Sequence, residues 1–328
     1  MHGAVADIVL GWCWLPVALL AHSFESSLSR TQGLMALIFL ISFAHQPLTF
    51  GLVYGDQAQR TTHRRMYTWA PGVAAVLIFI GVNVSLTLVA LIAGLWNAEH
   101  TLMQRYGLMR IYGRKAGDIN GTLEKPMLVA WLVTALLFLG GFVDLQKMVI
   151  KLGMDQTNSR GVELLDSLSG GATVLFWCGV CVSMVLTLRW VWAERGRVAN
   201  PASRAKWMYA LGTLGLVAAV MVDPIAGIAG YVAAHAIEYF AIVHSTLRRR
   251  GAAGDTSFIA AISSTRGRRA RLYLAYLTVI SAVMYVTLTV WNGQLYAFAI
   301  LFFGALHILY DGFVWKLRKP AVAASLGI

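Results

Sequence analysis

Long apolar runs separated by short polar stretches repeat along the whole chain. A helix needs about 20 residues to cross the roughly 30 Å hydrocarbon layer of a membrane. About nine runs reach this length. They cover Ala4–His22, Leu34–Tyr54, Trp69–Trp96, Met127–Met148, Ala172–Trp192, Trp207–Val222, Ile225–Thr246, Leu272–Trp291 and Leu295–Trp315. The pattern predicts an all-α, polytopic bundle of transmembrane helices.

Composition agrees with this pattern. Hydrophobic residues make up 58% of the 328 residues, charged residues only 13%, and the mean hydropathy is +0.65. Such values are typical of an integral membrane protein rather than of a water-soluble domain. Neither an internal repeat nor a long linker stands out, so we expect one integral-membrane domain over residues 1–328. The first run lacks the charge and cleavage pattern of a signal peptide, which predicts a retained span.

Breaks between the runs are short. Asp223 and Pro224 separate the sixth run from the seventh, and we expect a tight hairpin there because proline interrupts helical hydrogen bonding. Asp144 and Asp223 are expected as turn or cap residues. The longest connection, Lys151–Ser169, has mixed charge.

Basic residues gather in the connections and give the chain a formal net charge of +12. Because Lys and Arg favour the cytoplasmic side, nine spans predict an N-terminus outside, a C-terminus inside, and a location in the cytoplasmic membrane. The basic stretch at 60–65 is an exception to this pattern. We expect the inner loops to bind anionic lipid headgroups, and we expect no nucleic acid partner.

Histidines within the apolar runs are the main candidate chemistry. Placing an ionisable residue inside a membrane costs several kcal/mol of free energy. Each such residue is therefore expected to have a partner or a function. Spacings of three or four residues place two side chains on one helix face, and four histidines have an oxygen-bearing neighbour at that spacing. The pairs are His22 with Glu25, His100 with Gln104, His235 with Glu238, and His307 with Asp311. His45 lies beside Pro47 in another run, where a bent helix can present it.

Imidazole and carboxylate together are ligands of iron, manganese and zinc. We therefore expect a metal site with one or two ions, held by His45, His100, His235, Glu238, His307 and Asp311. Iron is the first expectation, zinc and copper are alternatives, and haem is a weaker one. Catalytic roles are expected for Glu238, Asp311, Tyr310 and Gln104. Tyr106 and Tyr239 are expected to orient ligands.

The stretch from Trp96 to Gly107 begins where the third apolar run ends. Here Asn97, His100 and Gln104 share one helix face and are predicted to point inward, whereas Glu99 and Arg105 are assigned to the membrane interface. His22 and His244 are expected in structural contacts, the first as an interfacial ion pair.

The sequence favours a membrane metalloenzyme, first of all an iron-dependent oxygenase or oxidoreductase that acts on a lipid or another apolar small molecule. Three alternatives remain open: a cation- or proton-coupled transporter, a haem-binding carrier linked to quinol, and a zinc-dependent lipid hydrolase. The tandem histidine boxes of membrane desaturases, HExxH, GxSxG and the P-loop are absent from the sequence. Three cysteines, all inside apolar runs, predict no disulfide framework.

Overall fold

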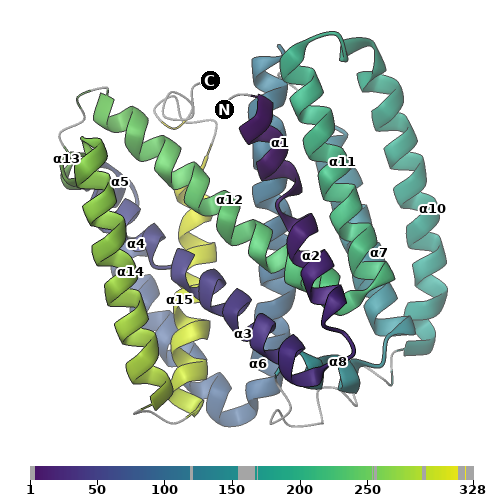
Figure 1. The fold of residues 1–328 in the computed structure, drawn as a ribbon, viewed down its shortest axis with the longest axis horizontal. Helices are drawn as coiled ribbons and strands as arrows, with labels where there is room; N and C mark the ends of the chain where they lie inside the picture. Colours follow the sequence, from purple (N-terminus) through teal and green to yellow (C-terminus); the bar gives the residue numbers. More distant parts are fainter. Residues whose placement is uncertain are drawn as a thin grey trace. The chain divides into compact units, whose positions relative to one another are not determined.

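A computed structural model shows a chain built from α-helices (Figure 1). It describes residues 4–118, 121–153, 167, 169–252, 254, 257–289, 293–316 and 322, and these residues contain no strand. Seven of the described helical segments are long and apolar enough to cross a membrane: Leu28–Tyr54, Arg64–Leu86, Glu124–Phe142, Ser169–Arg197, Pro201–Val222, Pro224–Ala252 and Leu295–Val314. A shorter apolar segment covers Asp7–Ser23. The all-α fold is confirmed, and the apolar helices indicate a membrane protein.

Residue contacts divide the chain into two compact units. Unit 1 comprises residues 1–39 and 98–238, and unit 2 comprises 40–97 and 239–327. The boundaries fall inside three helices: α3 (Leu28–His45), α6 (Arg64–Lys115) and α12 (Pro224–Ala252). A single domain over 1–328 stays a prediction.

Unit 1 holds the helices of the N-terminal and middle parts of the chain. Beside its parts of α3, α6 and α12, these are α1 (Ala4–Trp12), α2 (Trp14–Ser23), α7 (Glu124–Phe142), α8 (Leu145–Lys151), α10 (Ser169–Glu194), the 3₁₀ turn η1 (Arg195–Arg197) and α11 (Pro201–Val222). Helix α7 packs against both α10 and α11, and α11 also packs against α1. A buried apolar cluster that includes Trp14, Met35 and Leu216 forms a core of this unit.

Unit 2 holds the shorter helices α4 (Leu48–Tyr54), α5 (Gln57–Thr62) and α13 (Phe258–Ser263), and the long helices α14 (Arg266–Thr289) and α15 (Gly293–Val314). Its parts of α3, α6 and α12 complete the set. Leu52, Tyr67, Tyr239, Leu306 and Tyr310 belong to its main buried cluster, so aromatic rings fill much of this core.

The two predicted cap residues lie at helix starts. Helix α11 ends at Val222 and α12 begins at Pro224, with Asp223 in extended conformation between them. Asp223 Oδ1 accepts a hydrogen bond from the Ala226 amide, and Asp144 Oδ1 accepts one from the Lys147 amide. Both carboxylates therefore satisfy amides that the first turn of a helix leaves without partners. The break at Asp223-Pro224 is confirmed.

The predicted span Trp69–Trp96 is wrong as one continuous helix. Ser85 has φ −162° and ψ 99°, which interrupts α6, and its Oγ accepts a hydrogen bond from the Leu88 amide 3.3 Å away. The chain folds back here, since a Cβ built on Gly81 would lie 2.5 Å from Cγ2 of Val89. Ser85 thus caps a second helical segment inside the apolar run. The connection Lys151–Ser169 lies largely outside the described residues.

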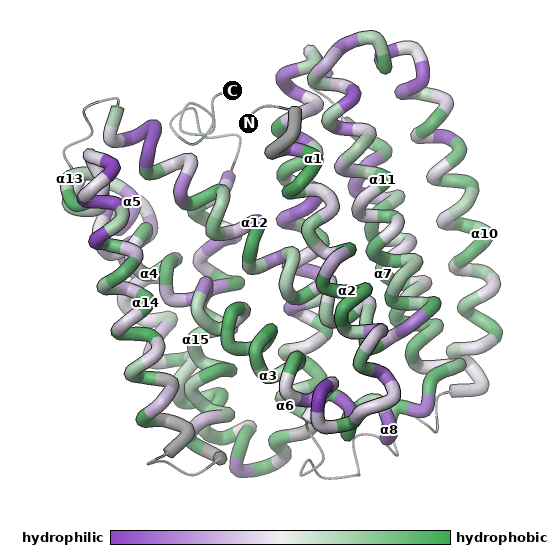
Figure 2. The backbone as a smooth tube through the Cα atoms, in the orientation of Figure 1, coloured by the Kyte–Doolittle hydropathy of each residue, from purple (hydrophilic) through white to green (hydrophobic). Residues whose placement is uncertain are grey.

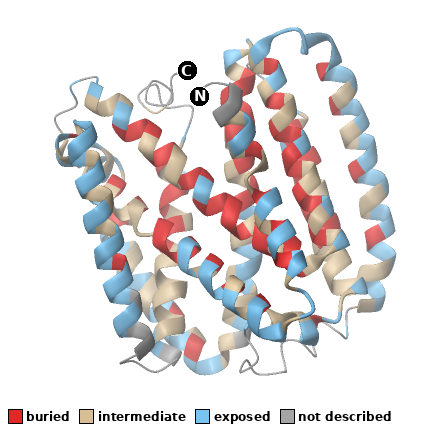
Figure 3. Ribbon diagram, viewed as in Figure 1, coloured by how far each residue is buried: buried red, intermediate tan, exposed pale blue. Residues whose placement is uncertain are grey.

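Helices α10 and α12 differ sharply in exposure, although both are apolar along much of their length (Figures 2 and 3). In an 18-residue apolar stretch of α10, only 6% of the residues are buried. In the corresponding stretch of α12, 78% are buried. Exposed apolar side chains suit contact with lipid, so α10 fits a lipid-facing position, whereas α12 is largely covered by other parts of the chain. Helix α12 carries both His235 and Glu238.

Close backbone approach at the α11–α12 turn makes Gly227 necessary. A Cβ at this position would lie 2.3 Å from the Cα of Val220. We expect Gly227→Ala to lower the free energy of unfolding by about 1–3 kcal/mol because backbone must move. Thermal unfolding in detergent measures the loss. Gly33→Ala in α3 is the control, since that Cβ meets nothing within 4 Å; equal stability of the two variants would contradict the prediction.

Candidate functional site

A polar cluster of unit 2 forms where α3 ends. Pro47 has no amide hydrogen and disfavours helical conformation in the residue before it, so α3 stops at His45 and α4 starts at Leu48. Thr49 therefore lies in the first turn of α4. Helix α15 contributes His307 and Asp311 on one face, four residues apart.

These side chains are buried and close together. His45 Nε2 lies 3.1 Å from His307 Nε2, and the exposed fraction of each residue is 1% or less. His307 Nε2 lies 3.7 Å from Asp311 Oδ2. Of the predicted metal ligands, unit 2 thus brings together three: His45, His307 and Asp311.

Hydroxyl groups hold this cluster in place. Thr49 Oγ1 lies 2.7 Å from His307 Nδ1 and 3.1 Å from Asp311 Oδ1. The Tyr239 hydroxyl donates to Asp311 Oδ1 over 3.0 Å and lies 2.6 Å from Thr49 Oγ1. Tyr239 was predicted to orient a ligand, and it contacts Asp311 directly. Thr49 was missed, although its position two residues after Pro47, at a helix start, is a usable signal.

Tyr310 points to a different group of aromatic residues. Its hydroxyl lies 2.9 Å from that of Tyr54, and its ring meets the ring of Tyr67 edge to face with centroids 5.0 Å apart. A catalytic role for Tyr310 stays a prediction.

Unit 1 holds the other predicted residues, His100, Gln104, His235 and Glu238. Gln104 Nε2 donates to the His235 carbonyl over 3.1 Å and to Glu238 Oε2 over 3.2 Å. The rings of His100 and His235 meet edge to face with centroids 5.0 Å apart. Gln104 and His100 therefore share the inward face, as the spacing predicted. One metal cluster that contains all six predicted ligands stays a prediction.

The assignment of Arg105 to the membrane interface is wrong. Arg105 is fully buried, and its Nη1 lies 3.1 Å from Glu238 Oε1. Its Nε donates to Thr213 Oγ1 over 3.0 Å and its Nη2 to the Gly11 carbonyl over 2.8 Å. A carboxylate inside an apolar bundle needs a cation, and the guanidinium of Arg105 meets that need for Glu238.

His22 and His244 lie in structural contacts. His22 Nδ1 is 2.7 Å from Asp223 Oδ2, with Glu25 Oε2 3.8 Å away, and these side chains are partly exposed. His244 Nδ1 is 3.0 Å from the Tyr273 hydroxyl.

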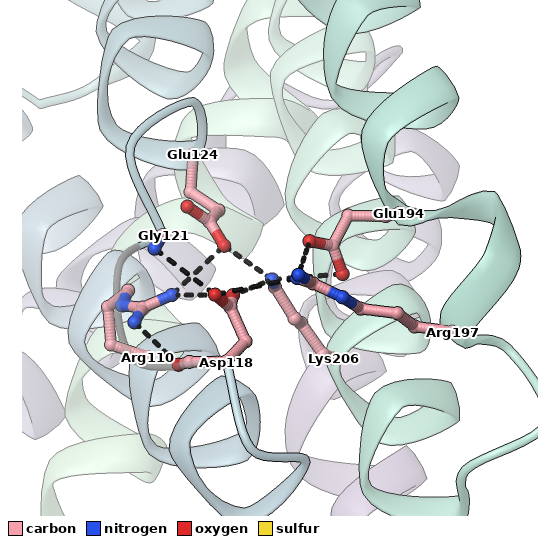
Figure 4. A network of polar contacts seen from close by, with 7 residues as sticks. All are labelled: Arg110, Asp118, Gly121, Glu124, Glu194, Arg197 and Lys206. Carbon is pink, nitrogen blue, oxygen red and sulfur yellow. Dashed lines mark hydrogen bonds and ion pairs between the residues drawn. The ribbon is translucent and has the colours of Figure 1, made fainter.

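A second buried group of charges in unit 1 was missed by the sequence analysis (Figure 4). The ammonium of Lys206 lies 2.8 Å from Asp118 Oδ2, 2.5 Å from Glu124 Oε1 and 3.1 Å from Glu194 Oε2. Lys206 itself is fully buried. Ligand oxygens of the three acids lie within 4.8 Å of one another, a spacing that would suit a metal ion, but here the lysine ammonium is the central cation.

Two arginines complete this ionic network. Arg110 Nη1 lies 3.0 Å from Asp118 Oδ2 and 3.1 Å from Glu124 Oε1, and half-exposed Arg197 contacts Asp118 and Glu194. Three positive charges therefore balance three negative ones. Gly121 has φ +41°, and a Cβ there would overlap the guanidinium of Arg110. Although burial favours the protonated form, Lys206 and Arg110 hold the pKa of Asp118 well below its usual value.

No protein-family model, no curated protein and no solved structure matches the chain. Its class is therefore defined by its own fold and chemistry: a helical membrane protein with buried His, Asp and Glu groupings that could hold a metal ion.

Lys206→Met tests the ionic network. We expect a loss of about 3–5 kcal/mol in the free energy of unfolding, because three buried carboxylates lose their shared cation. The matched variant Arg197→Gln should cost at most about 1 kcal/mol, because the Arg197 side chain is 50% exposed. Denaturant titration in detergent compares them. Equal losses in the free energy of unfolding would contradict the prediction that Lys206 stabilises the network more than Arg197 does.

Proposed function

We propose that the His45, His307 and Asp311 cluster of unit 2 binds a transition metal ion, and that the protein is a membrane metalloenzyme. The observation that carries this proposal is the 3.1 Å separation of the His45 and His307 Nε2 atoms. Two metal–nitrogen bonds of about 2.0–2.1 Å at a tetrahedral or octahedral centre place their nitrogens about 3 Å apart. The imidazoles therefore need little movement to share one ion.

Surrounding groups support the same role. Metal-binding histidines usually direct their second nitrogen to an oxygen that fixes ring orientation, as Thr49 Oγ1 does for His307 Nδ1. Asp311 is the third candidate ligand, held by Tyr239 and Thr49. Nitrogen and oxygen ligands without thiolate favour iron, with zinc or copper as alternatives.

Iron with open coordination positions supplies oxygen chemistry, so we propose an oxygenase or oxidoreductase. A site buried among apolar helices fits a lipid-soluble substrate, which enters from the membrane without crossing water. The chain's own residues hold the ion, exclude water and position a carboxylate beside it. We place the protein in the cytoplasmic membrane, because its basic connections favour the cytoplasmic side of the bilayer.

Metal content of the purified protein tests the proposal. After reconstitution with Fe²⁺ without oxygen, elemental analysis should find about one iron per chain, and the absorption spectrum should lack the Soret band of haem. His45→Ala and His307→Ala should each lose most of the iron. His244→Ala is the matched control, because His244 contacts Tyr273 instead.

Two results would contradict this proposal: no transition metal at all, or equal iron in the three histidine variants. Stoichiometric zinc in place of iron would contradict the oxygenase assignment and favour a hydrolase.

Thr49 provides a test of how the ligand is oriented. Thr49→Ala should weaken metal affinity about 10- to 100-fold, because His307 loses the oxygen that fixes its ring. Thr49→Ser keeps the hydroxyl and should restore affinity to within a few-fold of the original. Competition with a chromogenic chelator measures both values. If the Ala and Ser variants bind metal equally well, the hydroxyl does not position His307.

A further inference from the structure

Ten arginines gather at one end of unit 2. The sequence holds three at 60–65, three at 248–250 and four at 266–271. Direct contacts join these segments: Arg250 Nη2 lies 2.7 Å from Asp56 Oδ2 and donates to Ser257 Oγ over 3.2 Å, and Arg269 Nη1 donates to the Ser263 carbonyl over 2.9 Å. The end of α12, the start of α5, helix α13 and the start of α14 thus form one surface, called here the arginine end.

Little negative charge balances the arginine end. Among the described residues, Asp56 is the carboxylate found there, and Arg250 already binds it. Arg64, Arg65, Arg248, Arg266 and Arg271 are exposed. The ionic network of unit 1 is different, since its three cations face three carboxylates. The arginine end therefore presents a surplus of positive charge to its surroundings.

Exposed apolar side chains lie beside these arginines. Trp69 is 70% exposed and follows Arg65 by four residues on α6, which places both on one helix face. Phe258, at the start of α13, is 68% exposed. Tryptophan and phenylalanine next to guanidinium groups match the boundary between headgroups and acyl chains. A nucleic acid or an acidic protein would match the charge but would not explain the exposed apolar side chains that neighbour the arginines in the chain.

We infer that the arginine end is a docking surface for anionic phospholipid headgroups of the membrane that holds the spans. All ten basic residues are arginine, whose planar fork of donors binds phosphate oxygens in pairs. Trp69 and Phe258 rest in the acyl boundary below the phosphates. This inference is independent of the metal site.

The experiment compares two variants with the same change in net charge. One replaces Arg64 and Arg65 with Gln; the control replaces Lys147 and Arg189 of unit 1 with Gln, both exposed and outside the ionic network and the basic connections. Full-length protein in neutral detergent is titrated with phosphatidylglycerol or phosphatidylcholine, and native mass spectrometry counts bound lipid. Inorganic phosphate is a third probe.

The original protein and the control should bind phosphatidylglycerol at least roughly tenfold more tightly than phosphatidylcholine. The arginine-end variant should lose this preference, and 0.5 M salt should weaken the preference of the original protein. An unchanged preference in the arginine-end variant would overturn the inference, and so would phosphate binding as tight as lipid binding, or tighter binding of an oligonucleotide. If this variant unfolds, Arg266→Gln with Arg271→Gln gives the same comparison, with at least a several-fold loss expected.

Discussion

Inside a bundle of apolar helices, a charge must lie against its opposite charge, and the buried pair of Arg105 and Glu238 shows how unit 1 meets this constraint. Desolvating two ions costs several kcal/mol each, so the pair persists only with further hydrogen bonds. Thr213 and the Gly11 carbonyl accept from Arg105, while Gln104 donates to Glu238. One guanidinium thereby fixes α1, α6, α11 and α12 in unit 1. Gln104 also donates to the His235 carbonyl and so joins α6 to α12 a second time.

The two units use different polar chemistry. Unit 1 buries full charges and balances them, in the Arg105 pair and in the network around Lys206. The cluster of unit 2 joins imidazoles and one carboxylate, which are good ligands for a transition metal, with hydroxyls that hydrogen-bond to them. Two groups of possible metal ligands therefore differ in whether a cation is already present. Around Lys206 the cation is already part of the chain, whereas the two imidazoles of unit 2 could hold an external metal ion.

Structural features that depend on the spacing of residues close together in the chain were predicted correctly. Apolar length predicted the helices, Pro224 predicted the end of α11, and the four-residue spacing placed His307 with Asp311 on one face. Pro47 was expected only to bend the run Leu34–Tyr54, which the structure divides into α3 and α4. Sequence reasoning failed where a contact joins distant segments. Arg105 and Glu238 are separated by 133 positions, and their pairing depends on the rotation of α6, which helical spacing alone does not give. Lys206 was missed for the same reason: its partners come from the start of α7, the end of α10 and the loop after α6.

Ser85 shows why the number of spans is harder to predict than their existence. Asn83 and Ser85 are small polar residues within a run of apolar ones, and hydropathy averaged over about 20 residues hides them. Yet Ser85 Oγ accepts from the Leu88 amide, which satisfies one of the amides that a new helix start exposes. Such a cap makes a helix break possible inside hydrocarbon, where an unsatisfied amide would cost several kcal/mol. One hydroxyl can therefore turn one long apolar run into two helical segments, and each added crossing would reverse the side of the membrane assigned to every loop that follows.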